Sequence, residues 1–141
     1  MLKERSVGII VFRKDRNIKY LLLQYRAMHW EFSKGNIEKN ENTEQTGRRE
    51  LMEETGIKDV QLFEGFREKI NYFYKRQGKT VHKEVIFLLG ETKSEDVNIS
   101  YEHTGYSWKT LKESLEQLTF KNSKEMLNKA DDFISAVAIS S

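Results

Sequence analysis

The chain contains 141 residues and has neither cysteine nor proline. The missing cysteine excludes a disulfide framework, a thiol nucleophile and a cysteine-ligated zinc site. The missing proline leaves the turns to glycine, asparagine and aspartate, as at Asp15-Arg16-Asn17. The formal net charge of +2 is too small to favour nucleic acid or a membrane surface as a bulk partner.

Long apolar runs are missing as well. No stretch approaches the length of about 20 residues that a membrane-spanning helix requires. The N-terminus, MLKERSVGIIVF, has a short apolar run without a small-residue cleavage site, which indicates a strand rather than a signal peptide. These features predict a cytoplasmic protein with no membrane partner. The length suits a single domain, residues 1–141, around one core.

Several apolar runs predict β-strands. Residues 6–13 and 18–26 are joined by a polar turn, which is typical of a hairpin. Residues 60–75 and 80–90 predict two long strands around the polar loop Arg76–Lys79, and shorter strands are expected at 30–33 and 106–108. Because alternate residues of a strand face opposite sides, Tyr72 and Phe73 should lie on opposite faces. One of those two faces is expected to belong to the core.

Three segments predict helices. Residues 43–55 should form a helix with Asn42 or Thr43 as N-cap and Gly56 as its stop. A capping box beginning at Thr110 predicts a second helix to about residue 118, and Asn122 with Glu125 predicts the start of a final one. The order of strands, helix, strands and helices favours an α/β (α+β) fold with helices packed on a mixed sheet.

The predicted first helix has an acidic face. Glu50, Glu53 and Glu54 are spaced i, i+3, i+4, so their carboxylates project from one side and repel one another. A hard divalent cation reverses the sign of that interaction, and Mg²⁺ is usually held by carboxylates together with substrate phosphates. The cluster therefore suggests a metal site for a phosphorylated ligand. The alternative is an ordinary solvated face of glutamates.

Residues 35–57, GNIEKNENTEQTGRRELMEETGI, resemble the Nudix box, G-x5-E-x7-R-E-U-x-E-E-x-G-U, at every specified position. The resemblance implies a Nudix α/β/α sandwich, with the box helix on one side of a mixed sheet and the C-terminal helices on the other. It implies hydrolysis of a nucleoside diphosphate linked to another moiety, with Mg²⁺ or Mn²⁺ as cofactor. By the same likeness the metal-binding residues are Glu50, Glu53, Glu54 and Gly35, while Arg49 orients a carboxylate of the box.

The chemistry of pyrophosphate hydrolysis agrees with these roles. The reaction needs neutralisation of charge on the phosphate oxygens and a water made nucleophilic at neutral pH, and bound metal supplies both. The box does not decide which residue is the general base. Glu53 is one candidate, and Glu102 is another because family members often recruit a carboxylate from a loop beyond the box. By the likeness to the Nudix box, Glu41 should brace the loop of the box against its helix.

The flanks of the box resemble the asymmetrical diadenosine tetraphosphate hydrolases of the animal and archaeal type. The resembling segments are HWEFSKGN at 29–36, INY at 70–72, GKTV at 78–81 and YEH at 101–103, followed by YSW at 106–108. The likeness implies water attack at phosphorus, giving ATP and AMP. It implies that Tyr72 and Tyr106 stack on adenine, that His29, Lys34 and Lys79 bind polyphosphate, and that Glu102 is an additional catalytic carboxylate.

The chain departs from that pattern at a few positions. Ser33 stands where the family usually has proline, Asn36 where it usually has histidine, and Lys83 where an aromatic residue is often seen. These changes leave the carboxylates of the box intact. They fall on the loop and the strand that are expected to face the polyphosphate.

Other functions remain open from the sequence. A Nudix enzyme of this kind could instead act on RNA 5′ ends, ADP-ribose or oxidised nucleoside triphosphates, and nucleic acid is a partner only in the RNA case. The basic stretch Lys75–Lys79 is compatible with RNA phosphates. A non-enzymatic nucleotide-binding regulator on the same fold is a further alternative, since a fold does not define a function. We expect a monomer or a weak dimer.

Overall fold

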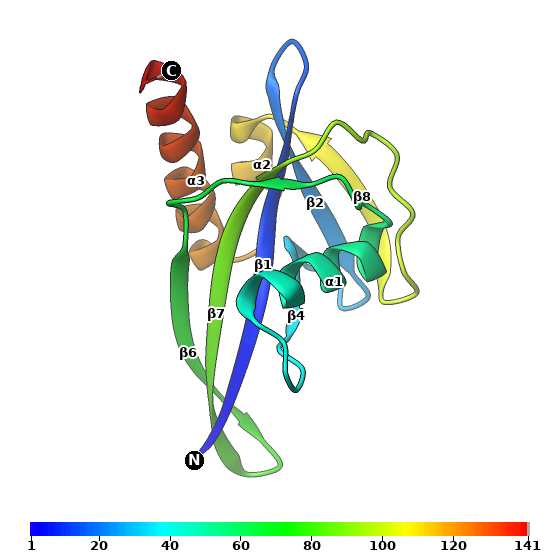
Figure 1. The fold of residues 1–141 in the computed structure, drawn as a ribbon. Coiled ribbons are helices and arrows are strands. Elements are labelled where there is room, and N and C mark those ends of the chain that lie inside the picture. Colours follow the sequence, from blue (N-terminus) through cyan, green and yellow to red (C-terminus); the bar gives the residue numbers. More distant parts are fainter. Residues whose placement is uncertain (141) are drawn as a thin grey trace.

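The computed structural model describes residues 1–140, and its centre is one mixed β-sheet (Figure 1). The strands are β1 (Leu2–Lys14), β2 (Ile18–Tyr25), β3 (Trp30–Glu31), β4 (Ser33–Asn36), β5 (Gln61–Leu62), β6 (Glu68–Arg76), β7 (Lys79–Glu91) and β8 (His103–Lys109). The helices are α1 (Thr43–Thr55), α2 (Leu111–Gln117) and α3 (Lys121–Ser140).

The sheet is organised around the long parallel pair of β1 and β7. Its main path runs β3-β2-β1-β7-β5, while β4 pairs with β1, β6 with β7, and β8 with β2. All pairs other than β1–β7 are antiparallel. The predicted hairpin of residues 6–26 is confirmed, with Phe12 opposite Tyr20. Nearer its N-terminus, at residues 6–9, β1 pairs with β4 in place of β2.

Both faces of the sheet are covered. Along β1, Ile10 and Phe12 join one buried cluster with residues of α3, such as Leu127. Their neighbours Ile9 and Val11 point the other way and join a second cluster with Leu51 of α1. The layers are therefore α1, sheet, and α2 with α3 (Figure 1). This confirms the predicted α/β/α arrangement, with the helix of residues 43–55 on one side and the C-terminal helices on the other.

The ends of α1 follow from its sequence. The Asn42 side chain accepts a hydrogen bond from the Gln45 backbone N–H at 2.8 Å, and the Gln45 side chain accepts one from Asn42 at 2.9 Å. Gly56 ends the helix at φ 78°, a conformation that glycine adopts without strain. Both predicted boundaries are confirmed. The buried stripe is short, so α1 depends on packing against the sheet more than on its own amphipathicity.

Two expectations from the sequence are wrong in detail. Residues 60–75 do not form one strand, because Gly65 at φ 93° turns the chain and Phe66 packs on Phe133 instead. The strand face expected in the core reaches it at Ile70, whereas Tyr72 on that same face and Phe73 on the other have 36% and 62% of their surfaces exposed.

The second error concerns the start of α3. The helix begins at Lys121, so Asn122 lies inside its first turn and is not the N-cap. The first turn is tied instead by a tertiary contact, in which the buried Ser123 hydroxyl donates to Glu31 at 2.7 Å. A side chain 92 residues away in sequence supplies that partner, so the local pattern did not reveal it.

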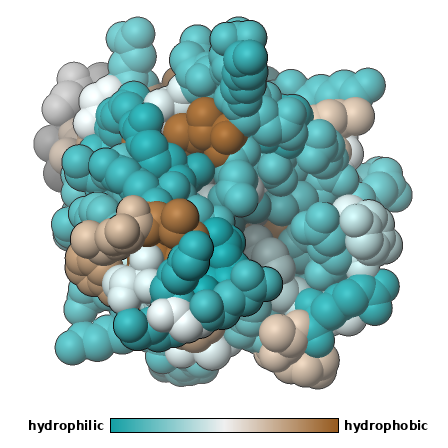
Figure 2. Space-filling model, turned by 90° about the horizontal axis from the view of Figure 1, so that it is seen from below, coloured by the Kyte–Doolittle hydropathy of each residue, from teal (hydrophilic) through white to brown (hydrophobic). Residues whose placement is uncertain are grey.

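The surface is mostly polar. Seen from the end that carries the N-terminus and the β6–β7 hairpin, it is hydrophilic with scattered apolar groups (Figure 2). Among residues 1–140, no helix combines the length and apolar character needed to cross a membrane.

We expect Gly8→Ala to lower the free energy of unfolding by about 1–3 kcal/mol, because overpacking forces neighbours to shift. A Cβ at Gly8 would lie 2.8 Å from the Phe87 ring and 2.9 Å from the Ser33 carbonyl oxygen. Gly105→Ala is the matched control, since the nearest atom to its Cβ would be 3.6 Å away. Urea denaturation measures both variants, and equal losses of stability would contradict this account of the packing.

Candidate functional site

The acidic face of α1 is brought to β4 by close packing of the helix on β1. A Cβ on Gly47 would lie 3.1 Å from Ile9, so the absence of a side chain lets the helix sit against the strand. One turn later, the Glu50 carboxylate occupies the space above Gly35 of β4, and a Cβ on Gly35 would overlap it. The glycine of the predicted motif is therefore required by a close approach between strand and helix.

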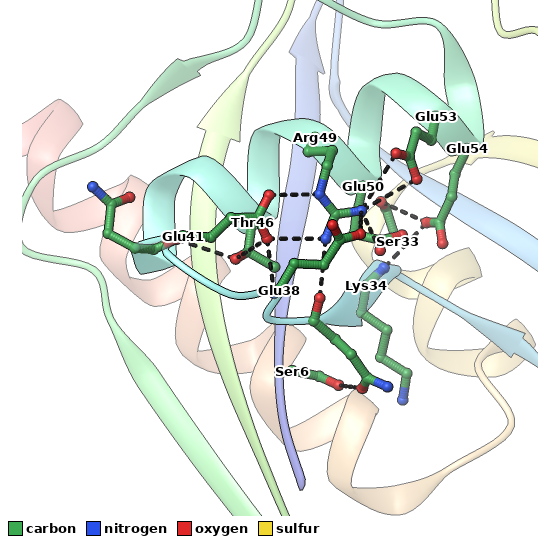
Figure 3. A network of polar contacts seen from close by, with 12 residues as sticks. Ser6, Ser33, Lys34, Glu38, Glu41, Thr46, Arg49, Glu50, Glu53 and Glu54 are labelled. Carbon is green, nitrogen blue, oxygen red and sulfur yellow. Dashed lines mark hydrogen bonds and ion pairs between the residues drawn. The ribbon is translucent and has the colours of Figure 1, made fainter.

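Arg49 connects the carboxylates of this region (Figure 3). Its Nε donates to Glu41 Oε2 at 2.6 Å and its Nη2 to Glu41 Oε1 at 3.0 Å, which is a bidentate pair. Its Nη1 donates to Glu50 at 2.9 Å and lies 3.3 Å from Glu53. The hydrogen bonds from Arg49 lower the pKa of Glu41 to about 2. One guanidinium thus neutralises part of a crowded acidic surface.

Glu41 also fixes the loop that leads into the helix. The Glu38 backbone N–H and the Thr46 hydroxyl both donate to its Oε1, at 3.0 and 2.9 Å. Since Arg49 holds the same carboxylate, loop and helix are joined through a single side chain. This is the bracing position in which the sequence placed Glu41.

Glu54 lies deeper than the other two glutamates, with 3% of its surface exposed. Its Oε1 accepts hydrogen bonds from the Ser33 hydroxyl at 2.7 Å and from the Lys34 backbone N–H at 3.2 Å. Burial raises the pKa of Glu54 to about 8, and the nearby charge of Glu50 adds to the shift. Burial also raises the pKa of Glu50. Ser33, where the resembling family usually has proline, supplies a donor that proline lacks.

A cleft of about 410 Å³ opens over these groups. We call it the carboxylate cleft, and it is lined by Ser6, Tyr25, Lys34, Gly35, Asn36, Glu38, Arg49, Glu50, Glu53, Lys83 and Glu102. Glu102 comes from the loop before β8, and its charge contributes to the raised pKa values of Glu50 and Glu54. The fold therefore brings this predicted residue, distant in sequence, to the box helix.

A second cavity of about 280 Å³ lies beside the first. We call it the aromatic pocket, and it is lined by Glu31, Lys34, Ile70, Tyr72, Phe120, Asn122 and Ser123. Lys34 lines both cavities, so they adjoin at this side chain. The place of Phe120 and Asn122 in a pocket was not anticipated, because Phe120 belongs to no motif and Asn122 was interpreted only as a helix cap. Only the packing of α3 beside β6 places them opposite Tyr72.

The other predicted binding residues lie outside both cavities. The His29 ring stacks on Tyr25 with centroids 4.7 Å apart and lies 5.3 Å from Phe120, so it sits between cleft and pocket. Tyr106 pairs with Leu23 across β8 and β2 and has 42% of its surface exposed. Lys79 begins β7 near Leu2, away from both cavities. Their binding roles stay predictions.

The donor set fits a hard divalent cation, although its contacts must change on binding. Among residues 1–140, no group of three or more His, Asp or Glu side chains is already arranged around a metal position. Arg49 engages Glu50 and Glu53, while Ser33 engages Glu54. Carboxylate oxygens are the ligands that Mg²⁺ prefers, and the missing side chain of Gly35 leaves the space that the Glu50 carboxylate occupies.

Known proteins resemble this chain over most of its length. The chain is 37% identical over 143 residues to the asymmetrical bis(5′-nucleosyl)-tetraphosphatase of Rattus norvegicus, covering 92% of this chain and 95% of that protein. The protein of the same name from Sus scrofa is 37% identical over 147 residues, covering 95% and 97%.

Solved structures resemble it too. A binary complex of a C. elegans Ap4A hydrolase superposes with a TM-score of 0.79 at 25% identity, covering 94% of this chain and 98% of that chain. The E. coli dihydroneopterin triphosphate pyrophosphohydrolase superposes with a TM-score of 0.74 at 17% identity, covering 92% and 97%, which supports the fold alone. The family model described as the NUDIX domain matches residues 2–130. The chain therefore belongs to the NUDIX family.

Proposed function

We propose that this protein is a divalent-cation-dependent hydrolase that cleaves a pyrophosphate bond in a dinucleoside polyphosphate, with diadenosine tetraphosphate giving ATP and AMP. The observation that carries the proposal is the position of Lys34, which lines both the aromatic pocket and the carboxylate cleft. The pocket proposed for the nucleobase and the cleft proposed for phosphate cleavage thus adjoin at the Lys34 side chain. The names of the rat and pig relatives, which match almost end to end, support the same substrate.

Nudix hydrolases generally use divalent cations. In this chain Glu50, Glu53 and Glu54, with the backbone of Gly35, would hold Mg²⁺ or Mn²⁺. When bound, the cation neutralises phosphate oxygens and makes a water nucleophilic at neutral pH.

The reaction also needs a group that accepts the proton of the attacking water. The new bond joins the water oxygen to phosphorus, and the bridging P–O bond breaks. Glu53 and Glu102 are the two candidate bases, since both line the carboxylate cleft and both are exposed. Arg49 donates two hydrogen bonds to Glu41 and so fixes the loop of residues 36–42 against the box helix.

Binding of the nucleoside rests on aromatic stacking and cations. Tyr72 and Phe120 line one pocket, where an adenine would gain about 1–3 kcal/mol from stacking on an aromatic face. Lys34 would bind the adjoining phosphates, with His29 and Tyr106 at the margin. Lys79 lies four residues along β7 from Lys83, about 13 Å at the usual rise per residue. It would bind only the distal end of a long substrate.

The substrate is tested with diadenosine tetraphosphate and Mg²⁺. We expect ATP and AMP in equal amounts, and in ¹⁸O water the label should appear in AMP. Glu54→Gln should lower kcat/KM at least about 100-fold, because it removes a charge required at the transition state. Glu44→Gln, on the exposed first turn of the same helix, is the control and should stay near wild type.

Formation of two ADP molecules, or undiminished ATP formation by Glu54→Gln, would refute this assignment. Turnover of RNA 5′-triphosphate ends, ADP-ribose or oxidised nucleoside triphosphates without turnover of diadenosine tetraphosphate would replace the substrate and leave the metal site in place.

The metal-free protein should lose stability as the pH rises. The pKa of Glu54 is about 8 in the folded state against 4.5 for the ordinary side chain. Between those values the folded state keeps a proton that the unfolded state releases, so this contribution is present at low pH and lost on approaching pH 8. In EDTA, the free energy of unfolding of Glu54→Gln should therefore exceed that of wild type by about 5 kcal/mol at pH 9 and by little at pH 5. Urea denaturation at both pH values measures the difference.

The matched control for that comparison is Glu44→Gln, on the exposed first turn of the same helix. It should leave the pH dependence of unfolding unchanged. A wild-type stability that is flat between pH 5 and pH 9 would contradict the burial argument.

The stacking role of Tyr72 predicts a change in substrate affinity. Tyr72→Leu should raise KM for diadenosine tetraphosphate about 10-fold with little change in kcat, since stacking is equal in ground and transition states. Phe73→Leu is the control, because Phe73 projects from the opposite face and stacks on His82 at 4.9 Å. Equal KM values for the two variants would remove Tyr72 from the site.

A further inference from the structure

Lys83 breaks the apolar alternation of β7. Its neighbours in the same phase, Val81 and Val85, are both fully buried, and Phe87 and Leu89 continue that phase into the core. Lys83 itself is half-buried. A charge in an otherwise apolar phase is costly unless it has a partner. The position therefore calls for a physical reason, and the surroundings of the ammonium provide one.

The Lys83 ammonium is held by a neutral group. Its Nζ donates to the Asn36 side-chain oxygen at 2.9 Å, and the Ser6 hydroxyl donates to the same oxygen at 2.7 Å. Asn36 is in turn tied to the box helix, because its backbone carbonyl accepts from Arg49 at 3.0 Å. The ammonium is thus fixed in direction while it keeps further N–H groups for another acceptor.

No carboxylate compensates this charge directly. Among the ion pairs of residues 1–140, none includes Lys83. Its cross-strand neighbour Glu4 binds the Tyr74 hydroxyl and lies 3.4 Å from Arg76 instead. Burial lowers the pKa of Lys83, the charge of Glu4 opposes that shift, and the charge of Lys34 adds to it. A half-buried ammonium without an ion-pair partner in the protein would be stabilised by an anion that binds from outside the chain.

The location of Lys83 identifies the class of anion. It lies directly opposite Tyr72 in the β6–β7 pair, so both side chains project from the same face of the sheet. It also lines the carboxylate cleft together with Lys34, Glu50 and Glu53. Lys83 therefore lies beside Tyr72, which lines the aromatic pocket, and lines the same cleft as Glu50 and Glu53.

We propose that Lys83, seated on Asn36, binds a phosphate group of the substrate in the segment between the base at Tyr72 and the bond cleaved at the carboxylates. The proposal rests on the proposed function for the identity of the substrate. Its physical basis is general, because an ammonium with free N–H groups forms charge-assisted hydrogen bonds to phosphate oxygens. The lysine that replaces an aromatic residue thus adds a second cation beside Lys34.

The first test is kinetic, with diadenosine tetraphosphate and Mg²⁺. Lys83→Met should raise KM roughly 10- to 100-fold and leave kcat within about threefold, because the contact is made equally in ground and transition states. Lys83→Arg keeps the charge and should recover most of the loss. Lys3→Met is the control, since Lys3 is exposed in the alternate phase of β1 and projects from the opposite face.

The second test measures binding without turnover. Inorganic tripolyphosphate is titrated into the protein in EDTA by calorimetry, and Lys83→Met should weaken its binding roughly 10-fold or more while Lys3→Met does not. This readout separates the two proposals. If diadenosine tetraphosphate is not hydrolysed but tripolyphosphate binding depends on Lys83, the substrate is wrong and the phosphate site stands.

The proposal is overturned if Lys83→Met binds tripolyphosphate as wild type does, if wild type does not bind it, or if only kcat falls. Urea denaturation of each variant excludes misfolding as the cause. Lys83→Arg provides the second variant should Lys83→Met unfold, and wild-type affinity in Lys83→Arg together with loss in Lys83→Gln supports the role of the charge.

Discussion

The close seating of α1 on β1 is the constraint on which the rest of the site depends. Gly47 lets the helix approach Ile9, and Leu51 enters the core one turn later. That distance places the Glu50 carboxylate above Gly35. A wider separation would leave the acidic face of the helix in solvent, where its charges would merely repel. The close packing of α1 on β1 also buries Glu54, and burial raises the pKa of that carboxyl. The apolar packing beneath the helix thus affects the charge of the groups above it.

The concentration of negative charge is balanced from several sides. Arg49 binds Glu41 through two hydrogen bonds and reaches Glu50 with a third. Ser33 and the Lys34 backbone provide donors to Glu54. These contacts hold the carboxylates in place, while a hard cation would compete for the same oxygens. The carboxylates are thus held by hydrogen bonds when no metal is bound, and their oxygens are the kind of ligand that a hard cation prefers.

The carboxylate cleft also contains positive charge, from Lys34 and Lys83. The phase of β1 and β7 that is apolar beneath α3 becomes polar towards the N-terminal end of β1, at Glu4, Ser6 and Lys83. There Ser6 is buried and Glu4 and Lys83 are half-buried, and Ser6 and Lys83 line the carboxylate cleft. Lys34 and Lys83 contribute positive charge to the carboxylate cleft, which Glu50 and Glu53 of α1 also line. A phosphate chain with bound cations is complementary to such a cleft.

The sequence by itself determined the features that depend on local spacing. These are the hairpin of β1 and β2, the caps of α1, and the family, because the motif of residues 35–57 records which groups one helix and one loop must carry. Only the tertiary structure decided what faces that motif. Phe120 joins Tyr72 through the packing of α3, and Lys83 meets Asn36 across the intervening strand β1. Such partners are distant in sequence and obey no fixed spacing, because sheet pairing and helix packing, not local periodicity, bring them together.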